Sequence, residues 1–258
     1  MLAALAALLG VLLSGPLAVA LVNGTHPQPP WRDAELFARH FHPLQLLPYA
    51  GGILLVAALV VLIASAHALA GDGLRARTGA ALAFTAAFAA FIFFNYVAQT
   101  TFVPDLARGY EPASAPIIAT LSMSNPRSLA WGIEMWGWGL LGVATWLVAP
   151  VFQSSTLERA VAITFTANGP VSVAGALWTI ARPGWVMTAA GLAAFAAWNV
   201  LLTAMGALAF IAFRRRLGRA PQQRTGATAA DAPAAGKSPE PRAQGGRVGA
   251  TGAGTGGR

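Results

Sequence analysis

Residues 125–152 read NPRSLAWGIEMWGWGLLGVATWLVAPVF. The stretch is apolar for most of its length, and a helix of roughly 20 residues at about 1.5 Å each crosses a hydrocarbon core of about 30 Å. Within it lies Glu134, a carboxylate at a depth where a charge is costly. Such a group marks either a polar pathway or a polar contact between helices, so Glu134 is the central candidate residue of the chain.

The composition places the whole chain among membrane proteins. Of its 258 residues, 56% are hydrophobic and 10% are charged, whereas soluble domains carry about 25% charged residues. Several apolar runs have the length of a membrane span. They predict an all-α integral membrane bundle of about six transmembrane helices in a domain of residues 1–219, with spans at about 2–22, 46–70, 79–103, 126–150, 159–180 and 186–213.

Residues 33–42 predict a short interfacial helix between the first two spans. Apolar side chains fall on one face of this segment and charged ones on the other, which is typical of a helix lying on a membrane surface. Residues 104–128 form the longest internal loop, in which Pro104, Pro112 and Pro116 break any long helix.

Two interpretations of the N-terminal run stay open. Residues 1–20 are either a signal peptide, with Ala18-Val19-Ala20 as the cleavage site, or the start of an uncleaved first span. The absence of Lys and Arg ahead of the apolar run, and the length of that run, favour the uncleaved span.

Capping residues predict where two later helices begin. Asn125 is a good N-cap and Pro126 suits the first helical position, so the fourth span is expected to begin there. Ser155 and Glu158 have the spacing of a capping box, which predicts a new helix at that point.

Arginines set the expected orientation. The cluster Arg214, Arg215 and Arg216 follows the last span and is typical of a cytoplasmic flank. With six spans, both termini are then expected in the cytoplasm, and the protein is expected in the inner (plasma) membrane of the cell. Residues 220–258 lack apolar periodicity and predict a disordered cytoplasmic tail. Many basic residues of the chain, whose net charge is +8, lie after residue 213, which indicates an anionic lipid or a protein partner at the tail and not nucleic acid.

Several polar side chains fall at membrane depth and predict an intramembrane cluster. Asn95 and Gln99 are four residues apart, so they share one face of a helix, at a depth close to that of Glu134. Asn168, beside Gly169-Pro170, and Asn199 lie nearer the middle of the membrane. The expected cluster is Glu134, Asn95, Gln99, Arg127, Asn168 and Asn199. Trp131, Met135 and Trp138 share one face and are expected to pack or to face lipid.

The residue types present exclude several chemistries. The chain has no cysteine, and Lys237 is its only lysine, so thiolate metal sites and a Schiff base within the bundle are excluded. His40 and His42 have no third ligand nearby, and HExxH, P-loop and GxSxG motifs are absent. We therefore predict no metal site, no cofactor and no catalytic residue.

One set of residues resembles a known sequence pattern and suggests the membrane in which the protein lies. Asn125-Pro126, Trp131, Glu134, Ala149-Pro150-Val151-Phe152 and Leu157-Glu158-Arg159-Ala160 together resemble a pattern of uncharacterised bacterial multi-pass membrane proteins. The resemblance covers roughly residues 80–180 and implies a bacterial inner membrane, without an activity.

Three functions remain as hypotheses. The first is a non-enzymatic membrane protein for small-solute or proton-linked transport or sensing, centred on Glu134. The second is a structural or partner-binding subunit in which Glu134 is a buried clamp between helices. The third is a membrane enzyme acting on lipid, which needs a second catalytic group at the depth of Glu134.

Overall fold

A computed structural model describes the backbone of residues 1–230 and the side chains of residues 1–216. The chain divides into two units, Met1–Gly218 and Arg219–Arg258, and the helices that build the core lie in the first. Every regular element of the described residues is helical, which confirms the all-α prediction.

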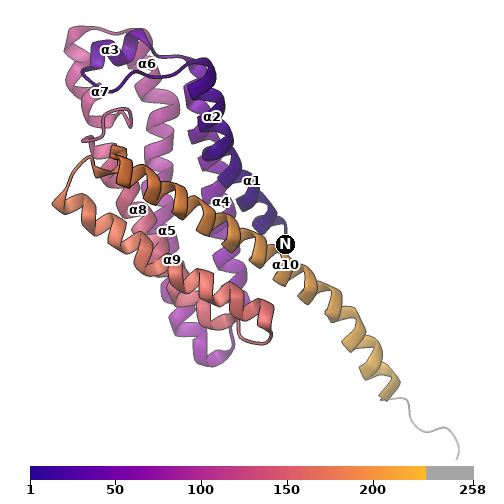
Figure 1. Cartoon of the computed structure of the whole chain (residues 1–258). Helices are drawn as coiled ribbons and strands as arrows, with labels where there is room; N and C mark the ends of the chain where they lie inside the picture. The colour runs from indigo at the N-terminus through magenta and orange to yellow at the C-terminus, as the bar shows by residue number, and fades with distance from the viewer. Residues whose placement is uncertain (231–258) are drawn as a thin grey trace, which may run out of the picture. The chain divides into compact units, whose positions relative to one another are not determined.

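The helices are labelled in Figure 1. Their bounds are α1 Leu2–Ser14, α2 Pro16–Thr25, α3 Ala34–Arg39, α4 Leu47–Ala68, α5 Arg75–Val97, α6 Val103–Arg108, α7 Ala115–Leu121, α8 Leu129–Val148, α9 Thr156–Ala181 and α10 Ala189–Ala230. Short turns join or extend them: η1 Pro43–Leu46, η2 Asp72–Leu74, η3 Ala98–Phe102, η4 Pro112–Ser114, η5 Ala149–Val151 and η6 Trp185–Met187.

Five helical segments of the described chain are long and apolar enough to cross a membrane: Leu2–Thr25, Pro43–Ala68, Asp72–Arg108, Thr156–Ala181 and Ala189–Arg216. The sixth expected span corresponds to α8, which has 20 residues but is not among the five. Its glycines, its tryptophans and Glu134 lower its hydropathy. The helix is nonetheless well buried, because it packs between α5 and α9.

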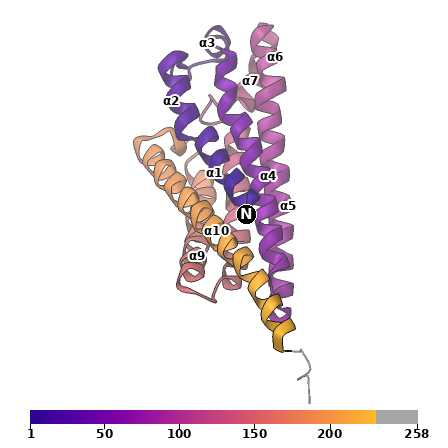
Figure 2. The ribbon, with the colours of Figure 1, turned by 90° about the vertical axis from the view of Figure 1, so that its right-hand side faces the viewer.

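The bundle is a series of neighbouring helices. Along the chain, α1 packs on α4, α4 on α5, α5 on α8 and α8 on α9. α10 crosses α1 obliquely (Figures 1 and 2), and a Cβ built on Gly206 of α10 would lie 3.1 Å from Leu8 Cδ2. Buried side chains from α1, α4, α5, α8, α9 and α10 therefore form one continuous core.

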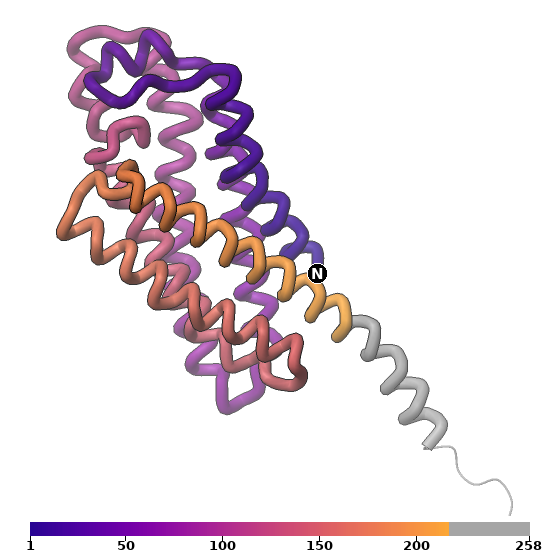
Figure 3. The backbone as a smooth tube through the Cα atoms, viewed as in Figure 1, coloured from indigo at the N-terminus to yellow at the C-terminus, as the bar shows by residue number. Residues whose placement is uncertain are grey.

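Two of the spans depart from simple helices for reasons that involve proline. The first is interrupted at Gly15, because Pro16 has no N–H to continue the helical hydrogen bonding of α1. The third does not end at residue 103 as expected but runs from Asp72 to Arg108 as one path (Figure 3). A π turn at Ala98–Phe102 precedes Pro104, and this wider turn gives room for the proline ring against the preceding turn.

Helices α3, α6 and α7 form a small cap with its own apolar core. Its buried members are Ala34, Phe37, Val103, Ala107 and Ile118. The interfacial helix expected at residues 33–42 appears as α3, with Asp33 as its N-cap. The Leu36 N–H and then the Arg32 guanidinium lower the pKa of the Asp33 carboxyl, because both bond to the charged form.

The C-terminal boundary differs from the prediction. α10 continues as a helix to Ala230, so residues 220–230 of the expected disordered tail have helical backbone. The rest of that predicted tail, residues 231–258, lies outside the described residues.

Candidate functional site

Glu134 lies in the second turn of α8. That helix begins three residues later than expected, because its N-cap is Ser128, whose Oγ accepts the Trp131 N–H at 3.3 Å. Asn125 instead closes the preceding turn: its amide donates to Ala119 O at 2.6 Å, and its Oδ1 accepts the Arg127 N–H at 3.1 Å. The predicted cap at Asn125 is therefore wrong.

Both carboxyl oxygens of Glu134 are hydrogen-bonded inside the bundle, and the residue is only 6% exposed. Oε1 accepts the Tyr96 hydroxyl at 2.7 Å and the Trp138 indole N–H at 2.8 Å. Oε2 accepts the Asn95 amide at 2.8 Å. The three donors replace part of the hydration that a buried carboxyl group loses.

The network extends from Glu134 to the segment that precedes α8. The Gln99 amide donates to Asn95 Oδ1 at 3.3 Å and to Leu121 O at 2.7 Å, while Gln99 Oε1 accepts the Met123 N–H at 3.1 Å. Gln99 lies in the π turn and is 3% exposed. It therefore satisfies backbone groups of the 121–123 connection that no helix satisfies.

Two residues of this site, Tyr96 and Trp138, were missed by the sequence interpretation. Trp138 is four residues after Glu134 and so lies on its face of α8, a spacing that could have assigned it to the site. It was instead assigned to packing or to lipid. Tyr96 follows Asn95 directly, and only the facing of α5 and α8 brings both to one carboxylate.

Asn168 belongs to a second buried network, in the middle of α9. Its amide donates to Thr145 Oγ1 at 3.1 Å, and its Oδ1 accepts the Ser172 hydroxyl at 3.1 Å. The Trp198 indole of α10 donates to Asn168 Oδ1 and to Ser172 Oγ, each at 3.2 Å. α9 continues through Pro170 without a break, so this network joins three intact helices.

A pair of tryptophans connects the two networks. Trp138, which bonds to Glu134, meets Trp198 edge to face with ring centroids 4.7 Å apart. The Phe88 ring also packs on Trp138, with ring centroids 5.0 Å apart. The contact between the networks is thus aromatic and apolar, and it does not carry a continuous chain of hydrogen bonds.

The other two members of the expected cluster lie elsewhere. The Asn199 amide donates to Phe195 O of its own helix at 2.9 Å. Arg127 is exposed and lines a surface pocket beside α8. The predicted cluster is therefore two separate networks, around Glu134 and around Asn168, with Asn199 and Arg127 outside both.

A second buried carboxylate lies at the start of α9. Glu158 is 5% exposed, and its Oε1 pairs with Arg216 Nε at 2.7 Å. Ser155 caps α9 as expected. In the predicted capping box, however, Glu158 would accept the N–H of Ser155, whereas its Oε2 accepts the N–H of Ser154 at 2.9 Å. Arg216, predicted only to set topology with Arg214 and Arg215, thus also anchors α10.

The polar contacts of Glu134 within the described residues are hydrogen bonds. Its contacts are a phenol, an indole and an amide, all of which donate to it. Among the described residues, no group of three or more His, Asp or Glu side chains has the arrangement of a metal site.

A scan of known protein families, a search of curated protein sequences and a search of solved structures each found no match for this chain.

Proposed function

We propose that this protein is a non-enzymatic, structural or partner-binding subunit located in a bacterial inner membrane. In this proposal Glu134 acts as a buried clamp between α5 and α8. The observation that carries the proposal is that Asn95, Tyr96 and Trp138 donate three hydrogen bonds to the two carboxyl oxygens of Glu134. A transport site needs a carboxylate that exchanges partners with solute or water. This one is closed off by protein donors.

The orientation in this proposal rests on the sequence. Arg214, Arg215 and Arg216 follow the last span, so the C-terminus, and with an even number of spans the N-terminus, lies in the cytoplasm. The basic tail would then face the cytoplasm, where it recruits a protein partner or anionic lipid.

A second candidate function is proton-linked sensing or transport of a small solute. It is favoured by the π turn at Ala98–Phe102, which carries Gln99 into the network, because π-bulges occur frequently at functional sites. The lipid-enzyme hypothesis has less support. It needs a second catalytic group beside Glu134, and the phenol, indole and amide that contact Glu134 all serve as hydrogen-bond donors to it.

Infrared spectroscopy of the protein in lipid separates the first two candidates. The spectra of the wild type and of Glu134→Gln are compared across pH, with Glu158→Gln to assign the other buried carboxyl. The clamp proposal expects no Glu134 band to change between about pH 5 and 8, the range a transport carboxyl would need. It also expects Glu134→Gln to lower the unfolding temperature.

The opposite result has a definite meaning. A carboxyl band that titrates in this range and disappears in Glu134→Gln, but persists in Glu158→Gln, overturns the clamp proposal. Proton-linked sensing or transport would then be the better-supported function.

A further inference from the structure

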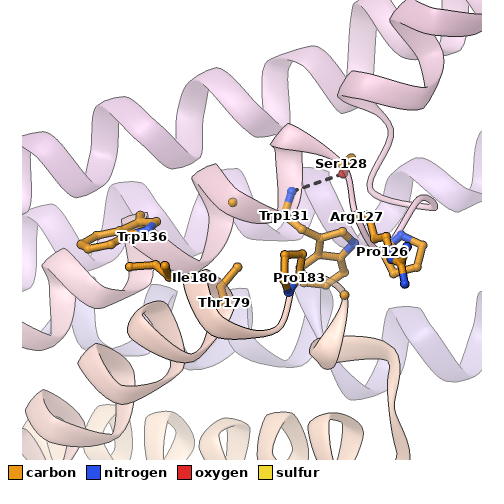
Figure 4. A pocket seen from close by; sticks show the side chains of 10 residues that line it. Pro126, Arg127, Ser128, Trp131, Trp136, Thr179, Ile180 and Pro183 are labelled. Atoms are coloured by element: carbon orange, nitrogen blue, oxygen red, sulfur yellow. Dashed lines mark hydrogen bonds between the residues drawn. The ribbon is translucent and has the colours of Figure 1, made fainter.

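A pocket of about 250 Å³ lies where α8 begins and α9 ends (Figure 4). It is formed by the turn that leads into α8, by the first two turns of that helix, and by the segment that joins α9 to α10. Its lining residues are Pro126, Arg127, Ser128, Trp131, Gly132, Trp136, Thr179, Ile180, Pro183 and Gly184.

The pocket has a charged end and an apolar end. Arg127 and Pro126 lie at one end and Trp136 at the other, with Ile180 beside Trp136 (Figure 4). Trp136 comes eight positions after the cap residue Ser128, a rise of about 12 Å along the helix axis. This polarity is that of one end of a phospholipid, with its headgroup followed by its chains.

The apolar end opens on the surface that lipid would cover. The side chains of Trp136 and Ile180 are 40% and 65% exposed, although both belong to the bundle. Leu129, in the first turn of α8, is 55% exposed. In a membrane-spanning bundle, exposed apolar side chains of this kind contact acyl chains.

Among the described residues, the charged end has no anionic partner. Arg127 forms no ion pair with the described residues. The sequence has no Asp or Glu in residues 112–133 or 159–230, and the oxygens of Glu134 are taken by other donors. Arg182, next to Pro183 in the chain, adds a second positive charge that also has no ion pair among those residues.

The backbone at Gly184 passes close to Arg127. Gly184 has φ of +85°, and a Cβ built on it would lie 3.3 Å from Arg127 Cγ and 3.3 Å from Pro126 O. Two other polar groups of the pocket are engaged: the Trp131 indole donates to Met123 O at 2.7 Å, and Thr179 Oγ1 accepts the Trp185 indole at 2.9 Å. Arg127 is the charged residue among those that line the pocket, and it has no ion pair among the described residues.

We propose that this pocket binds the phosphate headgroup of an anionic phospholipid. The phosphate lies against Arg127, and the first part of the acyl chains runs along Trp136 and Ile180. Pockets that enclose a drug-sized ligand measure about 300–1,000 Å³, so a smaller, open one holds only one end of a lipid. Because Arg127 has no ion pair among the described residues, its positive charge favours anionic over zwitterionic headgroups. This site is distinct from the basic tail.

The test measures lipid binding to the full chain in detergent by native mass spectrometry. Short-chain phosphatidylglycerol is titrated against phosphatidylcholine for the wild type, Arg127→Gln and Arg127→Lys. Arg108→Gln is the matched control, because Arg108 lies on α6, outside the pocket, and is 3.7 Å from Asp105. The tail is present in every variant, so its contribution cancels in the comparison.

The expected result is a preference for phosphatidylglycerol that falls about fivefold in Arg127→Gln, which corresponds to about 1 kcal/mol per basic residue at an anionic surface. Arg127→Lys should retain most of the preference, and Arg108→Gln should match the wild type. Unfolding temperatures without added lipid check that Arg127→Gln is folded. If it is not, Arg182→Gln is compared with Arg108→Gln in the same way.

Three outcomes would overturn the proposal. Equal losses in Arg127→Gln and Arg108→Gln indicate a general surface charge effect. Equal binding of the two lipids by the wild type removes the headgroup preference. Competition by inorganic phosphate or glycerol phosphate at the same concentration as the lipid identifies a soluble anion as the occupant, because the acyl chains would then contribute nothing.

Discussion

The Tyr96 hydroxyl offers the most direct test of the network around Glu134. Tyr96→Phe removes one O–H and leaves a ring that is 6% exposed in its place, packed 5.8 Å from the Tyr49 ring. The change deletes the 2.7 Å bond to Glu134 Oε1, while Trp138 still donates to that oxygen at 2.8 Å and Asn95 to the other at 2.8 Å.

The magnitude follows from the number and kind of bonds. Polar contacts between membrane helices contribute about 0.6 kcal/mol on average and at most about 1.7 kcal/mol. Tyr96→Phe deletes one such contact, so we expect it to cost about 1 kcal/mol. For a chain of this length, that corresponds to a fall of about 2–4 °C in unfolding temperature.

Tyr49→Phe is the matched control. Tyr49 lies on α4 beside Tyr96, but its hydroxyl makes no hydrogen bond with the described residues. Removal of this hydroxyl should leave the unfolding temperature close to that of the wild type. Reversible unfolding in mixed micelles, followed by tryptophan fluorescence, measures both variants.

A second background makes the test stricter. In Glu134→Leu the acceptor is absent, so the Tyr96 hydroxyl is buried without a partner, which itself costs free energy. Adding Tyr96→Phe to this variant should therefore be neutral or stabilising, the reverse of its effect in the wild type. Equal costs of Tyr96→Phe in both backgrounds, or equal effects of Tyr96→Phe and Tyr49→Phe in the wild type, would refute the assigned hydrogen bond.

Two further predictions concern helix contacts. Gly142→Ala should lower the free energy of unfolding by about 1–3 kcal/mol through overpacking, since the added Cβ would lie 2.7 Å from Ser172 Cβ. Gly132→Ala is the control: its added Cβ would have nothing within 4 Å, so it should be neutral or stabilising in the same unfolding assay. Arg216→Gln should cost about 1–3 kcal/mol, because the pair is partly exposed on the Arg216 side and Glu158 keeps the Ser154 N–H. Adding Glu158→Gln should recover much of that loss, and no recovery would contradict the ion pair.

The helical spans were predictable from the sequence because apolar runs of this length have few other stable forms. Their ends were less predictable, because capping and proline effects depend on the local path of the chain. Asn125 and Pro126 have the residue types of a helix start, but the side chain of Asn125 closes a turn and Ser128 caps the helix instead. Pro104 was expected to end a helix, whereas the π turn before it lets the helix continue.

The candidate site was predictable in depth but not in partnership. Helical rise alone places Asn95, Gln99 and Glu134 at one level, and the structure brings these three together. The same reasoning places Asn168 and Asn199 at a depth similar to each other, yet Asn168 bonds to Thr145 of α8 and Asn199 bonds within its own helix. Depth follows from position in one helix, whereas contact depends on how two helices are rotated, which a single sequence does not specify.

The composition of α8 explains why this helix carries the site although it is not among the most apolar ones. On one face, a Cβ at Gly137 would lie 2.5 Å from Ile92 Cδ1 of α5; on another, a Cβ at Gly139 would lie 2.9 Å from Ala176 Cβ of α9. Small residues on two faces let two helices approach closely. That approach brings α5 near enough for its Asn95 and Tyr96 to reach Glu134. The glycines that lower the hydropathy of α8 thus make it the central helix, and a central position is what a carboxylate at membrane depth requires.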